Sequence, residues 1–387
     1  MTVHETASAA IAAVRHALVA LSHDIHAHPE LGYQEFHSSA ATAQAVESAG
    51  FSMERGAAGL PTAFRAVSGN GPLRIAFCAE FDALPEVGHA CGHNIIAASA
   101  VGAAIGLAAV ARDIDVTVIL LGTPSEEGGG GKIDLINAGY FDDVHAAMMV
   151  HPWPNERLEA TCLAVDHFDV TFRGNAAHAS AAPWEGTNAL DAWTVAHVAL
   201  GLLRQQLAPG DQFHGIIAEG GAAANIIPSK VVARYMCRSL TSERLAALRQ
   251  RVDACFQAGA SATGASVTIE EIGHQFSHMV SDPDILAHYR RGAESVGRRF
   301  DLDDQGVARP TISTDMANVS LVVPSIHPML RIETHGAVNH QPEFTAACIT
   351  ASADQAVTDG AVALAHTAID TALDEPLRER LLTRATQ

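Results

Sequence analysis

Basic residues are scarce in this sequence. It has 24 Lys and Arg but 43 Asp and Glu, which gives a formal net charge of −19 with His neutral. A field of that sign repels phosphate backbones and excludes nucleic acid as a partner. Aromatic residues are also few, at 5%, but hydrophobic residues make up 48% of the chain, an ordinary value for a globular protein.

Long apolar runs and closely spaced cysteines are missing as well. The longest apolar stretch, residues 95–111, is interrupted by Ser99, Gly102 and Gly106 and is too short to span a bilayer. No basic segment followed by an apolar one is visible at the N-terminus, so we expect no secretory signal. The six cysteines are widely spaced and form no disulfide framework. These absences predict a cytoplasmic protein that is not attached to a membrane.

The length and the order of the predicted elements indicate two domains. A chain of 387 residues exceeds the usual size of one hydrophobic core. Strand-like runs at 74–78, 116–121 and 146–150 alternate with helical stretches. This alternation is typical of an α/β fold with a mostly parallel sheet and helices on both of its faces. It stops at residue 164 and returns at about 279.

The segment between these points predicts a small α+β domain. Two helical stretches, at 189–206 and 242–259, separate half-buried strands predicted at 168–173, 214–219, 231–239 and 266–272. Two helices on a four-stranded antiparallel sheet form a domain of about one hundred residues. We therefore expect a larger domain of residues 1–164 and 279–387, interrupted by an inserted domain of residues 165–278.

Polar residues of one chemical kind follow the three strand-like runs of the larger domain. The first run leads to Glu80, Asp82 and residues 88–94, the second to Glu126 and Glu127, and the third directly to His151. In open α/β sheets, ligands bind outside the carboxyl ends of the strands. A thiol, imidazoles and carboxylates brought to one edge of the sheet predict a transition-metal site.

Each of these motifs is ambiguous by itself, and only their convergence favours a metal site. A Cys-Gly-His triplet is more often structural than ligating, a Glu-Glu pair is usually a solvated turn, and a histidine after a strand is usually a core or surface residue. The glycines 128–131 suggest a phosphate-binding loop, but Lys132 is followed by Ile133 rather than by Ser or Thr. The phosphate-loop interpretation therefore fails.

Taken together, the motifs resemble the M20 metallopeptidases. The resemblance runs nearly from end to end and is closest to the aminoacylase/carboxypeptidase branch, whose members carry a Cys-Gly-His motif. The segments that carry it are His28–Gly32, Asp82–Pro85, His89–His93, Glu126–Gly131 and His151-Pro152. Asn94 and the run Thr314–Ser320 are similar to the subgroup of aminobenzoyl-glutamate hydrolases and β-alanyl dipeptidases.

The resemblance implies a site with two divalent metal ions. Its ligands would be Cys91, His93, Glu127, His151 and a late histidine, with Cys91 as a bridging thiolate. His340 is the candidate for the late histidine, and His335 and His327 compete with it. Thiolate favours zinc, whereas mixed nitrogen and oxygen ligands also accept manganese, cobalt or nickel.

The resemblance also implies the reaction, which is hydrolysis of the amide bond of an N-acyl amino acid or a small dipeptide. Glu126 takes the position of the general base, which accepts a proton from a metal-activated water and returns it to the leaving amine. Asp82 would orient a ligand imidazole. Which acyl group and which amino acid are accepted depends on the shape of the pocket, which the sequence leaves open.

The inserted domain resembles the lid and dimerisation domain of the same family. His178 would stabilise the oxyanion from the partner subunit of a homodimer, and Asn225 would assist it. Arg238, 13 residues after Asn225, would bind the substrate carboxylate. Alternatively, Arg238 could pair with a surface acid across the strands, and Asn225 could be a turn residue before Pro228.

Two other classes of function stay open at this point. A cysteine hydrolase would use Cys91 as its nucleophile beside His93, but it leaves Glu127 and His151 without a role. A binding protein could keep the fold without catalysis, although the full ligand set and Glu126 favour an enzyme. Hydrolytic activity that survives complete removal of metal would indicate the cysteine mechanism.

Overall fold

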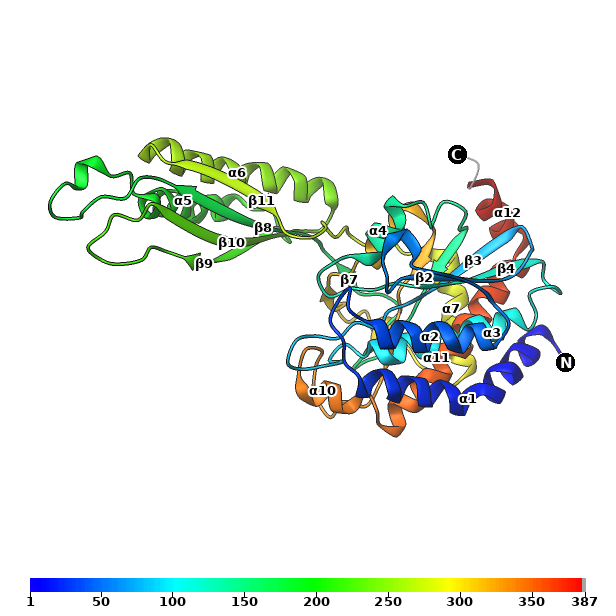
Figure 1. The fold of residues 1–387 in the computed structure, drawn as a ribbon. Helices are drawn as coiled ribbons and strands as arrows, with labels where there is room; N and C mark the ends of the chain where they lie inside the picture. The colour runs from blue at the N-terminus through cyan, green and yellow to red at the C-terminus, as the bar shows by residue number, and fades with distance from the viewer. Residues whose placement is uncertain (385–387) are drawn as a thin grey trace. The chain divides into compact units, whose positions relative to one another are not determined.

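The computed structural model describes residues 1–384, which form two compact units (Figure 1). Unit 1 consists of Met1–Thr161 and the chain from Met279 onward, and unit 2 is the continuous segment Cys162–His278. Unit 2 has a hydrophobic core of its own, and two clusters of buried side chains form the core of unit 1.

A six-stranded mixed sheet, in the order β1-β2-β4-β3-β5-β13, is the centre of unit 1. Strands β4, β3, β5 and β13 are parallel to one another, whereas β2 is antiparallel to both β4 and β1. The strands of the sheet are β1 (Ser52–Arg55), β2 (Phe64–Gly69), β3 (Leu73–Ala79), β4 (Val116–Gly122), β5 (Ala146–Met148) and β13 (Ser325–Ile326). Short strands outside it are β6 (His151–Trp153), which is parallel to β14 (Met329–Arg331), and β7 (Thr161–Cys162) and β12 (Thr311–Ile312).

Helices cover both faces of this sheet. In β3, Leu73, Ile75 and Phe77 belong to one buried cluster, and Ala76 and Cys78 belong to the other. Because side chains alternate along a strand, the two clusters lie on opposite faces. Figure 1 shows α1, α2, α3 and α11 together on one side of the central strands. The helices of the first cluster are α1 (Val3–Ala27), α2 (Phe36–Ser48), α3 (His93–Ala108), α7 (Pro283–Ser295), α10 (Pro342–Ala347), α11 (Ala351–Leu373) and α12 (Glu375–Arg384). Those of the second are α4 (Gly131–Asn137) and α9 (Met316–Val322), and α8 (Asp301–Asp304) and the 3-10 helix η1 (Ala57–Gly59) complete unit 1.

Unit 2 is built on a four-stranded antiparallel sheet in the order β11-β8-β10-β9. Its elements are β8 (Ala164–Arg173), η2 (Pro183–Glu185), α5 (Ala189–Leu203), η3 (Arg204–Gln206), β9 (Gln212–Glu219), β10 (Lys230–Ser239), α6 (Ser242–Thr263) and β11 (Ser266–Glu271). Figure 1 shows α5 and α6 side by side along one face of this sheet, where their apolar residues form the core of the unit. The expected fold class, a mostly parallel α/β sheet with an inserted α+β unit, is confirmed.

The apolar stretch noticed in the sequence forms α3, which is buried nearly all round between the sheet, α1 and α11. A helix that is apolar on every side is typical of a protein core. Across the described residues, no helix combines the length and the apolar character needed to cross a bilayer.

Candidate active site

The parallel strands of unit 1 end at the same edge of the sheet. Ala79 at the end of β3 pairs with Gly122 at the end of β4, and Phe77 pairs with Met148 at the end of β5. The segments that follow these strands therefore leave the sheet side by side. They carry the acidic residues of segment 80–82, the pair Glu126 and Glu127, and His151.

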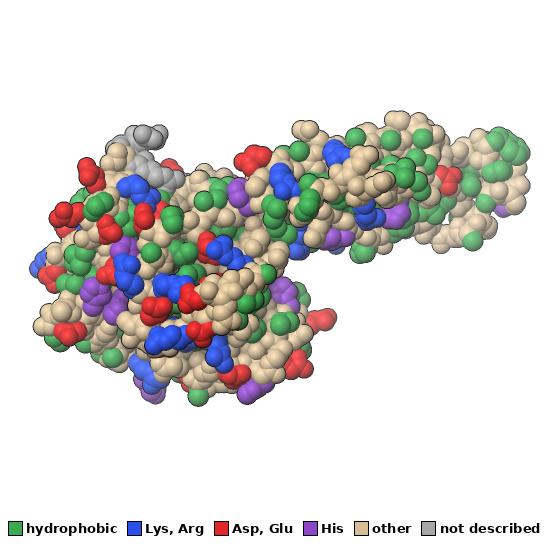
Figure 2. Space-filling model, turned by 180° about the vertical axis from the view of Figure 1, so that it is seen from behind, with side chains coloured by type: hydrophobic (Ala, Val, Ile, Leu, Met, Phe, Trp, Pro, Cys, Tyr) green, Lys and Arg blue, Asp and Glu red, His purple; other side chains and the backbone are tan. Residues whose placement is uncertain are grey.

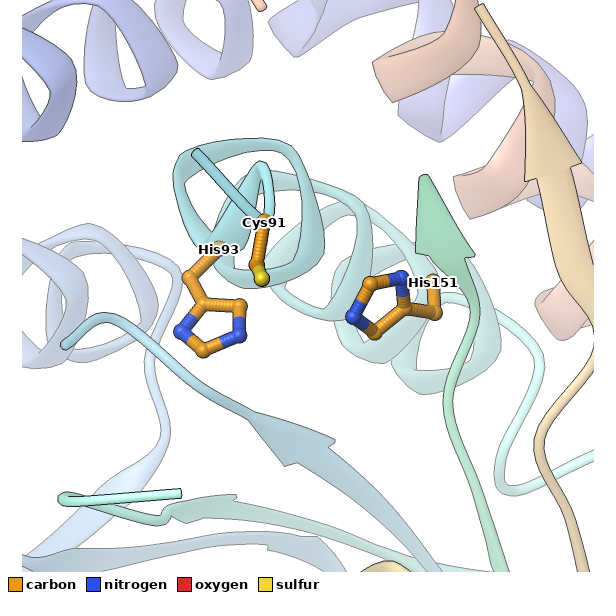
Figure 3. A group of neighbouring side chains, drawn as sticks. All are labelled: Cys91, His93 and His151. Atoms are coloured by element: carbon orange, nitrogen blue, oxygen red, sulfur yellow. The ribbon is translucent and has the colours of Figure 1, made fainter. Parts of the chain in front are cut away.

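Cys91, His93 and His151 converge at this edge. Their ligand atoms all lie within 4.8 Å of one another, and the three side chains are buried. Figure 3 shows the Cys91 sulfur pointing between the two imidazole rings, which stand at 89° to each other with their centroids 6.0 Å apart. Such a group of one thiol and two imidazoles can hold a transition-metal ion.

A second group shares Cys91 with the first. Cys91, Glu127 and His340 also place one ligand atom each within 4.8 Å of the others, and His340 Nε2 lies 3.8 Å from Glu127 Oε2. The His340 backbone has a positive φ of 71°, and its N–H donates to the Ala90 carbonyl beside Cys91. The geometry therefore brings the thiol between two sets of ligands.

The two competing histidines lie elsewhere. The side chain of His335 is 88% exposed and belongs to neither group. His327 is buried with its ring 5.4 Å from that of His151, but among the described residues no group of three ligands includes it. Geometry thus favours His340 as the late ligand.

Hydrogen bonds fix which ring nitrogen is free in His93 and in His151. His93 Nδ1 donates to the carbonyl of Asp82, 2.8 Å away, and to its Oδ1, 3.0 Å away. His151 Nδ1 donates to the Pro152 carbonyl at 2.8 Å. In both rings, Nε2 therefore carries the free lone pair. Metal-bound imidazoles usually have such a hydrogen-bond acceptor on their other ring nitrogen.

Unsatisfied buried atoms show that the site fits metal ions. His93 Nε2 and Glu127 Oε1 are buried without a hydrogen-bond partner. Buried polar atoms are nearly always paired in folded proteins, so unpaired acceptors that converge with a thiol indicate a site for a cation. Sulfur, nitrogen and oxygen donors together suit zinc or a related divalent ion.

Gly92 explains why the Cys-Gly-His triplet needs glycine at its centre. Its φ of 74° is left-handed, and a Cβ added to it would lie 2.9 Å from Cγ of Pro152, the residue after His151. The residue after the triplet is Asn94, whose Nδ2 donates to Ser22 Oγ and to the Cys348 carbonyl. An aspartate has no N–H to donate to these two acceptors, so the amide is the group that fits.

Glu126 lies beside the ligands without belonging to either group that contains Cys91. It is buried, with its Oε2 3.8 Å from His93 Nε2. Burial is the main cause that raises the pKa of Glu126 well above its ordinary value, and the charges of Glu80 and Glu127 raise it further. A carboxylate with a raised proton affinity next to a metal site is suited to accept a proton from water and to release it again.

The turn that presents Glu126 is held by the segment that follows the His-Pro-Glu-Leu-Gly motif. Glu35 Oε1 accepts hydrogen bonds from the backbone N–H groups of Ser125 and Tyr33, at 2.8 and 2.9 Å. Ser125 has a left-handed φ of 57°, and a Cβ on Gly129 would lie 2.1 Å from its Oγ. The segment after the motif thus supports the turn from which Glu126 projects. Burial raises the pKa of Glu35 to about 7.

Replacing Glu35 by Gln should reduce the pH dependence of stability. Because the folded-state pKa is raised, the stability that this group contributes is fully present below its ordinary pKa of 4.5 and is lost as the pH rises to about 7. The variant, which is always neutral, should equal the wild type near pH 4.5 and exceed it by up to about 3 kcal/mol at pH 8. Unfolding of both metal-free proteins across this range measures the difference, and a difference that stays constant with pH would contradict the argument.

A buried cluster of charges, unforeseen from the sequence, lies next to these residues. Lys132 Nζ donates to Glu80 Oε1 and, at 2.6 Å, to Asp315 Oδ1, and the Lys132 backbone N–H donates to Asp315 Oδ2. None of the three side chains is exposed. In the sequence, each of these three residues lies beside a recognised motif. Their spacing, however, does not indicate that the three side chains contact one another.

In unit 2, His178 and Asn225 come together. Residues 178 and 226 form an isolated antiparallel bridge, and the Ala179 N–H donates to the Asn225 carbonyl at 3.0 Å. His178 Nδ1 accepts hydrogen bonds from the backbone N–H groups of Ser180 and Ala181. In the neutral ring, the proton is therefore on Nε2, which leaves an imidazole with a donor available to a ligand.

Arg238 is a half-buried cation on β10. Its Nε donates to the sulfur of Met236, and no acidic residue of the described chain pairs with it. Burial lowers the pKa of Arg238, and its charge, after burial, also lowers the pKa values of His167 and His214. The surface-pair alternative for Arg238 therefore lacks a partner among the described residues, and the guanidinium can bind an anion.

Comparison with known proteins identifies the family. Residues 76–367 match the family described as Peptidase family M20/M25/M40. The chain belongs to this family. As an M20 peptidase, it is an enzyme that hydrolyses peptide or amide bonds with the help of metal, which confirms the resemblance found in the sequence.

The relatives of this M20 peptidase include dipeptidases and amidohydrolases. It is 41% identical over 377 residues to the Xaa-Arg dipeptidase of Mus musculus, covering 94% of this chain and 87% of that protein. It is 34% identical over 251 residues to one of the p-aminobenzoyl-glutamate hydrolase subunits of Escherichia coli (strain K12), covering 59% of this chain and 52% of that one. A solved Bacillus subtilis structure, described as a dinuclear metal binding peptidase from the M20 family, has the same fold with a TM-score of 0.71 at 20% identity, covering 93% of this chain and 98% of that one.

Proposed function

We propose that this M20 peptidase is a binuclear metal-dependent dipeptidase that cleaves dipeptides with a cationic C-terminal residue. The observation that carries the binuclear part is the sharing of Cys91 by two groups of ligands beside Glu126. His93 and His151 would complete one metal site, and Glu127 and His340 the other. Divalent zinc, manganese, cobalt or nickel ions would fit these donors.

The residues around the metals have separate tasks in this proposal. When bound, the metal ions supply Lewis acidity that polarises the amide carbonyl and activates water. Glu126 accepts the proton of the water and transfers it to the leaving amine. Asp82 keeps His93 in the tautomer that leaves Nε2 free.

Unit 2 would supply the groups that bind the substrate. Arg238 would bind its C-terminal carboxylate, which is supported by a half-buried guanidinium without an acidic partner among the described residues. His178, assisted by Asn225, would stabilise the oxyanion, which is supported by its available Nε2 donor. We place His178 in the active site of the partner subunit of a homodimer.

The surface of unit 2 supports a homodimer. Strand β9 is an edge strand, and Ile216 and Ile217 on it are 66% and 39% exposed. Val198 and Leu202 are likewise exposed on α5. Figure 2 shows many hydrophobic and few acidic side chains on the visible face of unit 2. An open strand edge beside exposed apolar residues suits pairing with a second copy of the chain.

The cationic preference is supported by the mouse relative and by the charge of the protein. The net charge of −19 attracts cationic substrates and repels acidic ones. The test is hydrolysis of Xaa-Arg, Xaa-Lys and Xaa-Asp dipeptides and p-aminobenzoyl-glutamate, with zinc, manganese or cobalt added. We expect Xaa-Arg or Xaa-Lys to be cleaved fastest and chelation to stop cleavage. Faster cleavage of p-aminobenzoyl-glutamate would overturn the cationic preference, and activity without metal would point to Cys91 as a nucleophile.

Arg238→Ala should weaken catalysis only for substrates with a free carboxylate. Loss of a desolvated charge-assisted contact costs about 2–5 kcal/mol in kcat/KM. The corresponding dipeptide amides should lose much less. Arg234 on the same strand is exposed and pairs with Asp169, so Arg234→Ala is the matched control and should leave both substrates unaffected. Equal losses for acid and amide would show that Arg238 has a structural role only.

A further inference from the structure

The two oxygens of the Glu80 carboxylate have different surroundings. Oε1 accepts a hydrogen bond from the ammonium group of Lys132. Oε2 is buried, has no hydrogen-bond partner and lies 3.6 Å from His93 Nε2. The Glu80 side chain is not exposed at all. A fully buried, unsatisfied carboxylate oxygen is costly, so the environment must compensate for it in the working protein.

The atom that Glu80 faces is itself unsatisfied. His93 Nδ1 is committed to Asp82, so its Nε2 is the atom available to a metal ion. This nitrogen is buried without a partner, and it stands in a group with Glu80 and Glu126 whose ligand atoms lie within 4.8 Å of one another. His93 Nε2 and Glu80 Oε2 are thus two buried, unpaired acceptors that face each other across 3.6 Å.

We infer that Glu80 is a further protein ligand of the metal ion held by His93, an inference that rests on the proposed function. Ligand bonds of about 2.0–2.2 Å place two donors of one zinc ion roughly 3.3 Å apart. The observed 3.6 Å between Glu80 Oε2 and His93 Nε2 is close to that separation. Glu80 would then join His93 as a ligand of that ion, from a group that includes His93 and Glu126 but not Cys91.

Lys132 and Asp315 make this ligand possible. The ammonium group binds Glu80 Oε1, so Oε2 alone is directed at His93 and Glu80 binds through one oxygen. Lys132 is in turn held by Asp315 through both its side chain and its backbone. The positive charge of Lys132 also offsets the concentration of carboxylates around the site, which would otherwise be expensive to bury. Lys132 and Asp315 are therefore positioning residues.

Glu80→Gln tests the assignment. The amide oxygen of Gln would stay with the Lys132 donor, which turns an NH2 group that cannot bind metal toward His93. The metal-free variant is titrated with Zn²⁺ in competition with a chromophoric chelator. We expect the affinity for one of the two ions to fall by more than about 100-fold. This loss exceeds the 10–100-fold range that is typical when a residue only supports a ligand. The second ion should bind as in the wild type. The visible absorption spectrum of Co²⁺ in the weakened site should change in the same variant.

Asp315→Asn is the matched control, because it removes an equally buried charge from the same cluster without touching His93. It should weaken binding by less than about 100-fold and leave the Co²⁺ spectrum unchanged. Equal effects of the two variants, or an unchanged spectrum in Glu80→Gln, would overturn the inference. If a thermal unfolding assay shows that Glu80→Gln does not fold, Glu80→Asp replaces it. This variant keeps the charge but shortens the side chain by one methylene, which moves the oxygen away from His93. Normal binding of both ions by Glu80→Asp would then overturn the inference. A wild type that binds no metal contradicts the proposed function instead.

Discussion

Glu126→Gln is expected to lower kcat by about 10²–10⁴-fold while the protein keeps both of its metal ions. The amide is similar in size to the carboxylate, but it cannot accept the proton of the attacking water. Glu126 lies with Glu80 and His93 but in neither group that contains Cys91, and the amide that replaces it has the same size, so we expect both ions to stay bound. Steady-state kinetics with a cleaved dipeptide and elemental analysis of the same preparation measure the two quantities.

The neighbouring Glu127→Gln separates the roles of the two glutamates. Glu127 lies with Cys91 and His340 in one group, and its Oε1 is buried and unsatisfied. We expect this variant to lose one of its two ions and, with it, activity that excess metal partly restores. Equal metal loss in both variants would show that Glu126 is a ligand rather than the base, and full activity in Glu126→Gln would exclude it as the base.

The second large effect concerns His178 and needs two subunits. An oxyanion donor contributes roughly 10²–10³-fold to kcat, so His178→Ala alone should be nearly inactive. When Glu126→Ala and His178→Ala proteins are mixed and exchange subunits, about half of the dimers are mixed. Each mixed dimer has one complete site if His178 acts in the partner's site, because the subunit that lacks His178 keeps its own Glu126. Roughly a quarter of the wild-type activity should then return.

Subunit exchange must be shown independently, for example with subunits that carry different affinity tags. A mixture that exchanges and stays inactive would rule out action of His178 across the dimer. If the protein proves to be monomeric at assay concentrations, the homodimer itself is wrong. The control is a mixture of Glu126→Ala with Glu127→Gln, in which neither subunit type lacks His178, so the partner's His178 cannot account for any activity that returns.

Most of the candidate ligands were accessible from the sequence because they follow buried strands that run parallel to one another. Strands β3, β4 and β5 are nearly continuous apolar runs, so their ends, and therefore the edge at which Glu127 and His151 lie, could be predicted. The choice between His340, His335 and His327 depended on the resemblance, because the loops before and after β14 that carry them have no regular pattern. The positions of these histidines depend on backbone φ values, such as the positive φ of His335 and His340, and on packing. Neither can be predicted from the local sequence pattern.

The buried charge cluster lies beyond sequence reasoning for a physical reason. Lysine is almost never fully buried, so the burial preferences of the amino acids would place Lys132 on the surface. It meets Asp315 across 183 residues of sequence and Glu80 across 52. Strand β1 was missed for a different reason: most of its residues are exposed, so its sequence lacks the apolar pattern of a buried strand.

Unit 2 interrupts the sequence of unit 1, and this arrangement determines the order in which the two units can fold during translation. The residues of unit 2 are contiguous, so they can fold as soon as they leave the ribosome. Unit 1 must wait for the chain after residue 278, which takes roughly 5–20 s to synthesise. Until then α3 lacks α11, against which it packs so closely that a Cβ on Gly102 would lie 2.7 Å from Ala361.

The nascent chain therefore exposes an apolar helix while its inserted unit is already folded, a state in which chaperone binding is expected. Cys91, His93 and His151 precede unit 2 in the chain, whereas His340 follows it. The group that contains Cys91, Glu127 and His340 can thus be completed only after unit 2 has been synthesised. If the proposed ligands are right, we expect the second ion to bind only after the segment that follows unit 2 has been synthesised.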